Sequence, residues 1–280
     1  MQKRKLCTYS IFFTGVAFFL YCWHKLGSPD LRVKKQIKNE TPTLFIHGYS
    51  GSRLSLGPMI KRFSKYGWGK KSAVIVVGNR GKIKITGNPA IKGGLIQVLF
   101  AKSRMPVNVQ STWLYHLMKL LYTKYQIKEV NFIAHSQGGV TVLHYLSQHA
   151  FDTEVAHVKK VVTLGAPFND FETGKTTRVI ERNTFETLTP LFQKIKQHSW
   201  RFTHDVEFMN IAGDKTDGST SDGEVAVISV QALRYILQGA LHNYHEFIIT
   251  GKRAGHRNLH ENQQVDKLIG RFLFSVEVDK

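Results

Sequence analysis

The chain has 280 residues, of which 42% are hydrophobic, and its formal net charge is +19 at pH 7. The length and apolar content exclude a disordered chain and are sufficient for one large domain with its own core. The positive charge favours contact with polyanions, but the basic residues are scattered and no nucleic-acid-reading motif is present. We therefore expect anionic cell-wall polymers or lipid headgroups as partners, and no nucleic acid. A cationic surface that only keeps the chain soluble is the alternative.

The N-terminal segment has the pattern of an export signal. Lys3, Arg4 and Lys5 precede residues 6–23, which carry no charge and are mostly apolar. This run is near the lower limit for crossing a bilayer, and the bulky residues at its end do not resemble a cleavage site. We therefore expect residues 1–25 to be an uncleaved signal anchor, with the rest of the chain on the extracytoplasmic face of the cell membrane. Secretion after cleavage is the alternative.

The remainder is predicted to be a basic tether, residues 26–41, and one domain, residues 42–280. The only cysteines, Cys7 and Cys22, lie in the N-terminal apolar segment. The domain therefore has no disulfide framework and no cysteine metal site.

From residue 43 onward, apolar runs alternate with segments of helical period. The predicted strands are residues 43–46, 72–78, 82–86, 95–101, 129–135, 158–165, 206–212 and 245–249. The predicted helices are residues 51–66, 108–125, 138–149, 230–237 and 262–274. A small hairpin is expected from residues 82–86 and 95–101. Strands separated by helices at this spacing predict an α/β fold with a mostly parallel sheet and helices on both faces.

Residues 169–201 contain no predicted strand and form an insertion between two core strands. Leu188, Leu191, Phe192 and Ile195 would share one face of a helix. Long insertions of this kind are often lids, so we expect a small helical lid that closes over the functional site and shapes its pocket. The alternative is that this face packs on the body of the domain.

The sequence VNFIAHSQGGV at residues 130–140 has the form of a nucleophile elbow. In such a turn an apolar strand runs directly into a serine and a helix follows, so the hydroxyl is exposed above the sheet. The turn is tight, which explains the small residues Ala134 and Gly138 on either side of Ser136. The N-terminus of the helix would also point its N–H groups at the reaction centre. We predict that Ser136 is a catalytic nucleophile; the alternative is that it only caps the helix.

A nucleophilic serine needs a histidine as base and a carboxylate that orients the histidine. After an elbow of this kind, the acid follows a late strand and the histidine follows the last strand. Asp214, Asp217 and Asp222 follow the strand before the last, and His256 and His260 follow the last one. The turn DGEV that begins at Asp222 resembles the acid-bearing turn of many lipases, which favours Asp222. We favour His256 as the base, because His260 lies closer to the next helix and is expected to orient the loop or bind substrate.

Acyl transfer also requires backbone N–H groups that face the oxyanion as it develops. One is expected from Gln137, directly after the nucleophile, and the other from Tyr49, in the loop after the first core strand. Losing one such donor costs about 3 kcal/mol of transition-state stabilisation, so both should be rigidly held. Gly48 would allow a close backbone approach, and His47 would organise the loop. No paired histidine spacing with a nearby acidic ligand is present, so we expect no metal ion.

Five short segments carry these features: FIHGYSGS (45–52), AHSQGG (134–139), GAPF (165–168), SDG (221–223) and HRNLHEN (256–262). As a set they resemble one family, the uncharacterised cell-surface alpha/beta hydrolases of Gram-positive bacteria, which are lipase-like in their motifs. The resemblance spans residues 42–275. It implies an alpha/beta hydrolase fold and a serine hydrolase with Ser136, Asp222 and His256 as its triad, but no particular substrate.

We therefore expect an extracytoplasmic serine hydrolase that cleaves carboxylic esters, either small molecules or lipids, through an acyl-enzyme. This reaction requires no cofactor. The alternatives are an acyltransferase or thioesterase that uses the same residues, and a surface-binding module that has kept the fold and lost the chemistry.

Overall fold

The computed structural model describes residues 33–36, 40–78, 82–169, 179–180, 184–185, 188–202, 205–237 and 243–278. The predicted signal anchor lies outside these residues. Among the helices in the described ranges, none is long and apolar enough to span a membrane. Within the predicted tether, β1 (Val33–Gln36) pairs antiparallel with β12 (Val276–Val278), so the two ends of the described chain lie together.

One sheet of eight strands organises the described part of the chain, in the order β11-β10-β7-β6-β2-β5-β3-β4. Neighbouring strands are parallel except for β3 and β4, which run antiparallel at one edge. The α/β class and the mostly parallel sheet predicted from the sequence are confirmed. The strands are β2 (Thr43–Ile46), β3 (Lys71–Val77), β4 (Ile83–Gly87), β5 (Leu95–Phe100), β6 (Glu129–His135), β7 (His157–Leu164), β10 (Glu207–Asp214) and β11 (Tyr244–Thr250).

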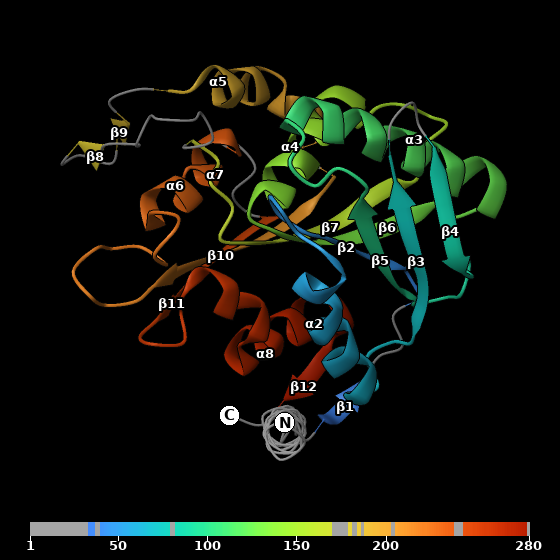
Figure 1. Cartoon of the computed structure of the whole chain (residues 1–280), viewed down its shortest axis with the longest axis horizontal. Coiled ribbons are helices and arrows are strands. Elements are labelled where there is room, and N and C mark those ends of the chain that lie inside the picture. Colours follow the sequence, from blue (N-terminus) through green and yellow to red (C-terminus); the bar gives the residue numbers. More distant parts are fainter. Residues whose placement is uncertain are drawn as a thin grey trace, which may run out of the picture.

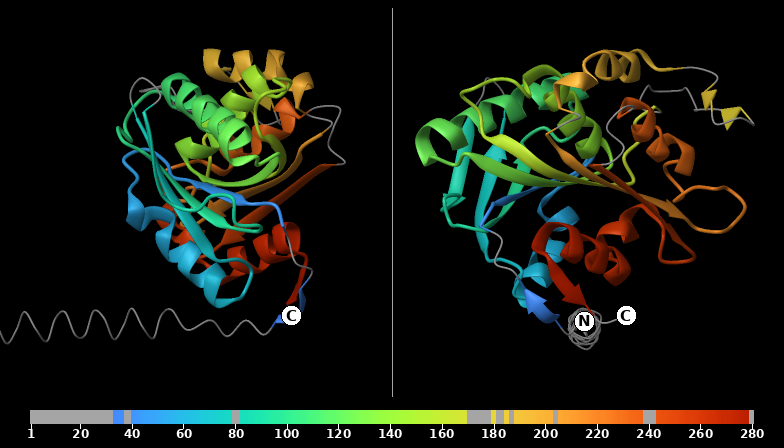
Figure 2. Two further views of the ribbon diagram at one scale, coloured as in Figure 1. Left: turned by 90° about the vertical axis from the view of Figure 1, so that its right-hand side faces the viewer. Right: turned by 180° about the vertical axis from the view of Figure 1, so that it is seen from behind.

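Helices cover both faces of this sheet, as Figures 1 and 2 show. The lower face in Figure 1 carries α2 (Arg53–Lys65) and α8 (Gln263–Phe274), whose apolar residues form one core cluster. The opposite face carries α3, α4, α5 and α7, whose apolar residues form a second cluster, and a small third cluster packs α6 on β10. The bounds of these helices are α3 (Val107–Tyr125), α4 (Gln137–His149), α5 (Pro190–Gln197), α6 (Val227–Gln231) and α7 (Leu233–Ile236).

The hairpin predicted from residues 82–86 and 95–101 is wrong. β4 pairs antiparallel with β3, whereas β5 enters the sheet between β2 and β3 and runs parallel to both. The physical reason is burial: β5 is almost entirely buried and takes a central position, while β4 alternates exposed and half-buried residues and suits an edge. Alternation and apolar content predicted the two strands but not their partners.

The described part of the predicted lid packs on the body of the domain. Phe192 and Ile195 in α5 are fully buried and belong to the core cluster that includes α4, and Leu188 and Leu191 pack against it. These contacts favour the second of the two alternatives for this helix face. Two short strands, β8 (Val179–Ile180) and β9 (Thr184–Phe185), pair antiparallel where no strand was predicted. The rest of the insertion, residues 170–178, 181–183 and 186–187, lies outside the described residues.

One buried histidine, His144, leads to a prediction of how the stability of the fold depends on pH. His144 lies between α4 and α3, where its Nδ1 is 2.9 Å from the Ser111 hydroxyl, and burial lowers its pKa from 6.5 to about 4. The unfolded chain therefore binds more protons than the folded chain between these two pH values. We expect the free energy of unfolding to fall as the pH is lowered from 6.5 to about 4, with at most about 1.4 kcal/mol per pH unit from this group.

His144→Phe should make that decline shallower in urea titrations at a series of pH values. An unchanged pH dependence in this variant would show that His144 titrates normally in the folded protein.

Candidate active site

Ser136 lies where β6 ends and α4 begins, in a strained turn. Its backbone has φ 54° and ψ −132°, a region that residues other than glycine rarely adopt. The Ser136 N–H donates to the Leu164 carbonyl of β7 at 2.9 Å, which ties this turn to the sheet. The side chain makes no capping hydrogen bond to α4, so Ser136 is not simply a helix cap. It is partly exposed at the carboxyl edge of the strands.

The small residues around Ser136 are required by close contacts between two loops. A Cβ atom on Gly48 would lie 2.7 Å from the Ser136 Cβ, and one on Gly138 would lie 2.6 Å from the His47 carbonyl oxygen. These separations are far inside van der Waals contact. The loop after β2 therefore packs directly against the turn at Ser136.

Asp222 and His256 form a buried hydrogen-bonded pair. His256 Nδ1 lies 2.7 Å from Asp222 Oδ2, and both side chains are almost fully buried. A carboxylate only accepts hydrogen bonds, so Nδ1 carries the proton and Nε2 of the neutral ring is left to accept one. The other oxygen of Asp222 accepts the N–H groups of Glu224 at 2.9 Å and Val225 at 2.7 Å. The backbone of its own turn therefore holds the Asp222 carboxylate in the orientation in which it binds His256.

The backbone around this pair leaves little room for movement. The His256 N–H donates to the Asp222 carbonyl at 2.9 Å. Gly165, at the end of β7, has φ 56°, and a Cβ there would lie 2.9 Å from Asp222 Oδ2. On the exposed side, the Glu224 carboxylate lies 3.9 Å from His256 Nε2. Nδ1 is thus occupied by Asp222, and Nε2 is the ring nitrogen on the side of the exposed Glu224 carboxylate.

The structure places the other candidate acids and the second histidine elsewhere. Asp217 is exposed, and hydrogen bonds from Ser219 and Lys215 hold the pKa of its carboxyl well below its usual range. Asp214 accepts the backbone N–H of Thr216 at 2.8 Å. The imidazole of His260 pairs with a different carboxylate, since its Nδ1 lies 3.2 Å from Glu261 Oε1. Of the candidates, the structure thus brings together Asp222 and His256.

The His47 ring joins the loop after β2 to the end of β5. Its Nδ1 lies 2.8 Å from the Gly48 carbonyl, and its Nε2 accepts the Phe100 N–H at 3.0 Å. Burial lowers the pKa of His47, which fits a neutral ring with one donor and one acceptor. In the described part of the chain, the backbone N–H groups of Tyr49 and Gln137 donate to no protein acceptor. Both N–H groups are therefore free to bind another acceptor, and Gln137 directly follows Ser136.

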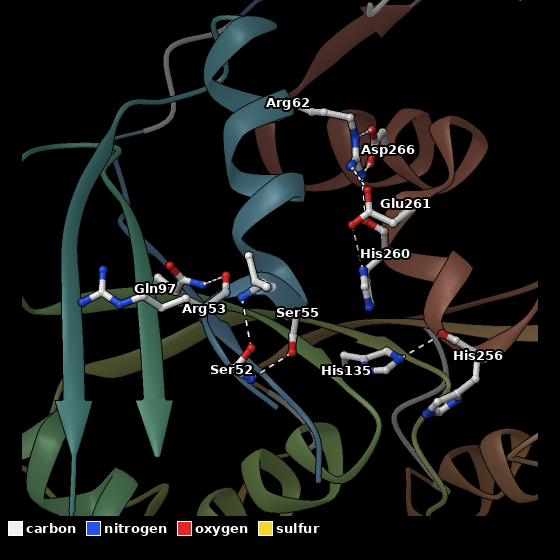
Figure 3. Close-up of polar contacts among 11 residues, drawn as sticks. Ser52, Arg53, Ser55, Arg62, Gln97, His135, His256, His260, Glu261 and Asp266 are labelled. Carbon is white, nitrogen blue, oxygen red and sulfur yellow. Dashed lines mark hydrogen bonds and ion pairs between the residues drawn. The ribbon is translucent and has the colours of Figure 1, made fainter. Parts of the chain in front are cut away.

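Three buried groups around the segment that carries His256 and His260 have no role assigned from the sequence, namely His135, Arg62 and Asp266 (Figure 3). Arg62 of α2 forms two hydrogen bonds to Asp266 of α8, at 2.7 and 3.0 Å. It also donates to Glu261 at 2.6 Å and to the His260 carbonyl at 2.7 Å. Burial raises the pKa of Asp266, and the neighbouring guanidinium opposes this shift. No sequence signal links the two partners, because 204 positions separate them.

The fold and this arrangement define an alpha/beta hydrolase. The chain belongs to the family of alpha/beta hydrolases of unknown function DUF915, whose model matches residues 30–276. It is similar to the lin2722 gene product of Listeria innocua, with 27% identity, a TM-score of 0.78, and coverage of 86% of this chain and 96% of that one. No curated protein matches the sequence.

More distant structures share the fold. A candidate cell surface hydrolase from Lactobacillus plantarum WCFS1 is 24% identical, with a TM-score of 0.65 over 85% of this chain and 92% of that one. The lipase BlEst2 of Bacillus licheniformis is 14% identical, with a TM-score of 0.52 over 89% of this chain and 96% of that one. The Pyrococcus furiosus esterase Pf2001 has the same identity and TM-score over 87% of each chain.

Proposed function

We propose that this alpha/beta hydrolase is a serine hydrolase that cleaves carboxylic esters. The observation that carries the proposal is the buried hydrogen bond of 2.7 Å between Asp222 and His256, next to the strained turn at Ser136. Two proteins that share the fold are an esterase and a lipase, which agrees with an ester substrate. We infer that the substrate is a small-molecule or lipid ester.

In the proposed mechanism Ser136 attacks the acyl carbon while His256 takes its proton at Nε2 and later returns it to the leaving group. Asp222 holds the imidazole in the tautomer that leaves Nε2 free, and stabilises the imidazolium as it forms. The oxyanion is bound by the N–H groups of Gln137 and Tyr49. In the second half of the reaction His256 takes a proton from a water molecule, which attacks the acyl-enzyme. The acid is released, and Ser136 regains its proton from His256. Apart from the ester and water, the groups that act in each step belong to this chain.

Hydrolysis of nitrophenyl esters of graded acyl length by the full-length protein tests this function. We expect turnover that is lost after treatment with a fluorophosphonate. Turnover of thioesters alone would instead favour the thioesterase, and acyl transfer to an added alcohol without hydrolysis would favour the acyltransferase. A folded protein that neither turns over an ester nor reacts with the probe would be a binding module.

We also propose that the enzyme acts on the extracytoplasmic face of the cell membrane, near anionic wall polymers. The basic leader and the apolar residues 6–23 support this location, as does the description of the Lactobacillus plantarum protein. We expect full-length protein in the membrane fraction, digested by protease added to intact cells. A shortened soluble form in the medium would instead show that the signal is cleaved.

A further inference from the structure

The residue before Ser136 contacts the backbone of His256. His135 is the last residue of β6, its side chain is buried, and its Nε2 lies 3.0 Å from the carbonyl oxygen of His256. A carbonyl only accepts hydrogen bonds, so Nε2 carries the proton and donates it. The His135 ring also packs against the His256 ring, with centroids 4.5 Å apart. Figure 3 draws this hydrogen bond as a dashed line, and the ring of His260, whose centroid is 4.8 Å from that of His135, lies above it in the view.

His135 can keep donating this hydrogen bond while His256 gains and loses a proton in the proposed reaction. Burial, with smaller effects from His256 and His260, lowers the pKa of His135 well below its ordinary value. The ring therefore stays neutral and keeps donating at neutral and mildly acidic pH. It also adds no positive charge beside His256 when that ring takes up a proton.

The turn that carries His256 is held at both of its ends by side chains from other elements. The residues His256–Glu261 form η4, a short 3-10 helix, a type of turn with weaker internal hydrogen bonds than an α-helix. His135 of β6 binds the carbonyl of its first residue. Arg62 of α2 binds the carbonyl of His260 near its end, at 2.7 Å. These anchors set the position of η4 relative to the sheet.

We propose that His135 is a positioning residue that fixes His256 relative to Ser136. Because His135 and Ser136 are consecutive, one hydrogen bond connects the strained turn directly to the segment that bears the base. A misplacement of about 1 Å at a reacting group lowers rates by up to about 100-fold. The inference rests on the proposed function, in which His256 takes the proton of Ser136.

Three variants separate positioning from general stability. His135→Phe keeps a ring and removes the donor, whereas His135→Gln places an amide N–H near the position of Nε2. His144→Phe is the matched control, since His144 is also buried and hydrogen-bonded but lies between α3 and α4. We expect kcat for a nitrophenyl ester to fall about tenfold or more in His135→Phe with KM nearly unchanged, and to recover largely in His135→Gln. His144→Phe should keep the wild-type kcat.

A second readout does not depend on ester hydrolysis. The His256 Nδ1 proton, in its short hydrogen bond to Asp222, should give a downfield proton NMR signal that shifts or broadens in His135→Phe and persists in His135→Gln. Equal kcat values in the Phe and Gln variants, or an unchanged signal in His135→Phe, would overturn the proposal. An inactive wild-type protein would refute the proposed function, while the NMR comparison would still decide the role of His135. If His135→Phe does not fold, His135→Met, which also lacks a donor and fills irregular space, replaces it.

Discussion

Ser136→Ala is expected to lower kcat for ester hydrolysis by about 10⁴-fold or more. The reason is that the variant lacks the proposed nucleophile, so that only binding and oxyanion stabilisation would remain. The unfolding temperature should hardly change, because the Ser136 side chain makes no capping bond and alanine is of nearly the same size. Initial rates with nitrophenyl esters and thermal unfolding of both proteins provide the two measurements.

Ser64→Ala is the matched control for this experiment. The Ser64 hydroxyl is buried in α2 and has no hydrogen-bond partner among the described residues. Its removal should therefore change neither rate nor stability by much. A Ser136→Ala variant that keeps even a tenth of the activity would remove Ser136 from the role of nucleophile.

Arg62→Met is expected to lower the free energy of unfolding by about 3–5 kcal/mol. The variant leaves Asp266, whose side chain is fully buried, without the guanidinium that binds both of its oxygens. It also removes the donors to Glu261 and the His260 carbonyl. Urea unfolding of the variant and the wild-type protein at pH 7 measures the difference.

The double variant Arg62→Met/Asp266→Leu separates the buried charge from the packing around it. Replacing both partners with apolar residues leaves no unpaired buried charge, so we expect most of the lost stability to return. If the double variant were as unstable as Arg62→Met, the loss would come from the contacts to η4 rather than from Asp266.

Features that depend on adjacent residues were predictable from the sequence. The strand, serine and glycines of residues 130–140 determine the turn at Ser136 locally, and β6 has the predicted bounds. The pairing of Asp222 with His256 was predicted because parallel strands bring their carboxyl ends to one edge of the sheet. His256 and Asp222 were favoured over their neighbours, and the structure brings these two together.

Features that depend on distant residues were not predictable. Alternation along residues 82–86 indicates a strand but does not say whether it pairs with β3 or β5. The apolar face of α5 has the same sequence pattern whether it covers a site or packs on α4, where Phe192 is buried. The contact between Arg62 and Asp266 joins two amphipathic helices, and each residue alone reads as an ordinary exposed charge.

The most direct test of the central claim is the site at which a fluorophosphonate attaches to the full-length protein. The reagent reacts with a serine that a neighbouring base activates, so we expect one adduct per chain, located by peptide mass spectrometry on Ser136. The adduct should be absent in Ser136→Ala and strongly reduced in His256→Gln. Attachment to a different residue, or no attachment to the folded wild-type protein, would contradict the assignment of Ser136, His256 and Asp222 as a catalytic triad.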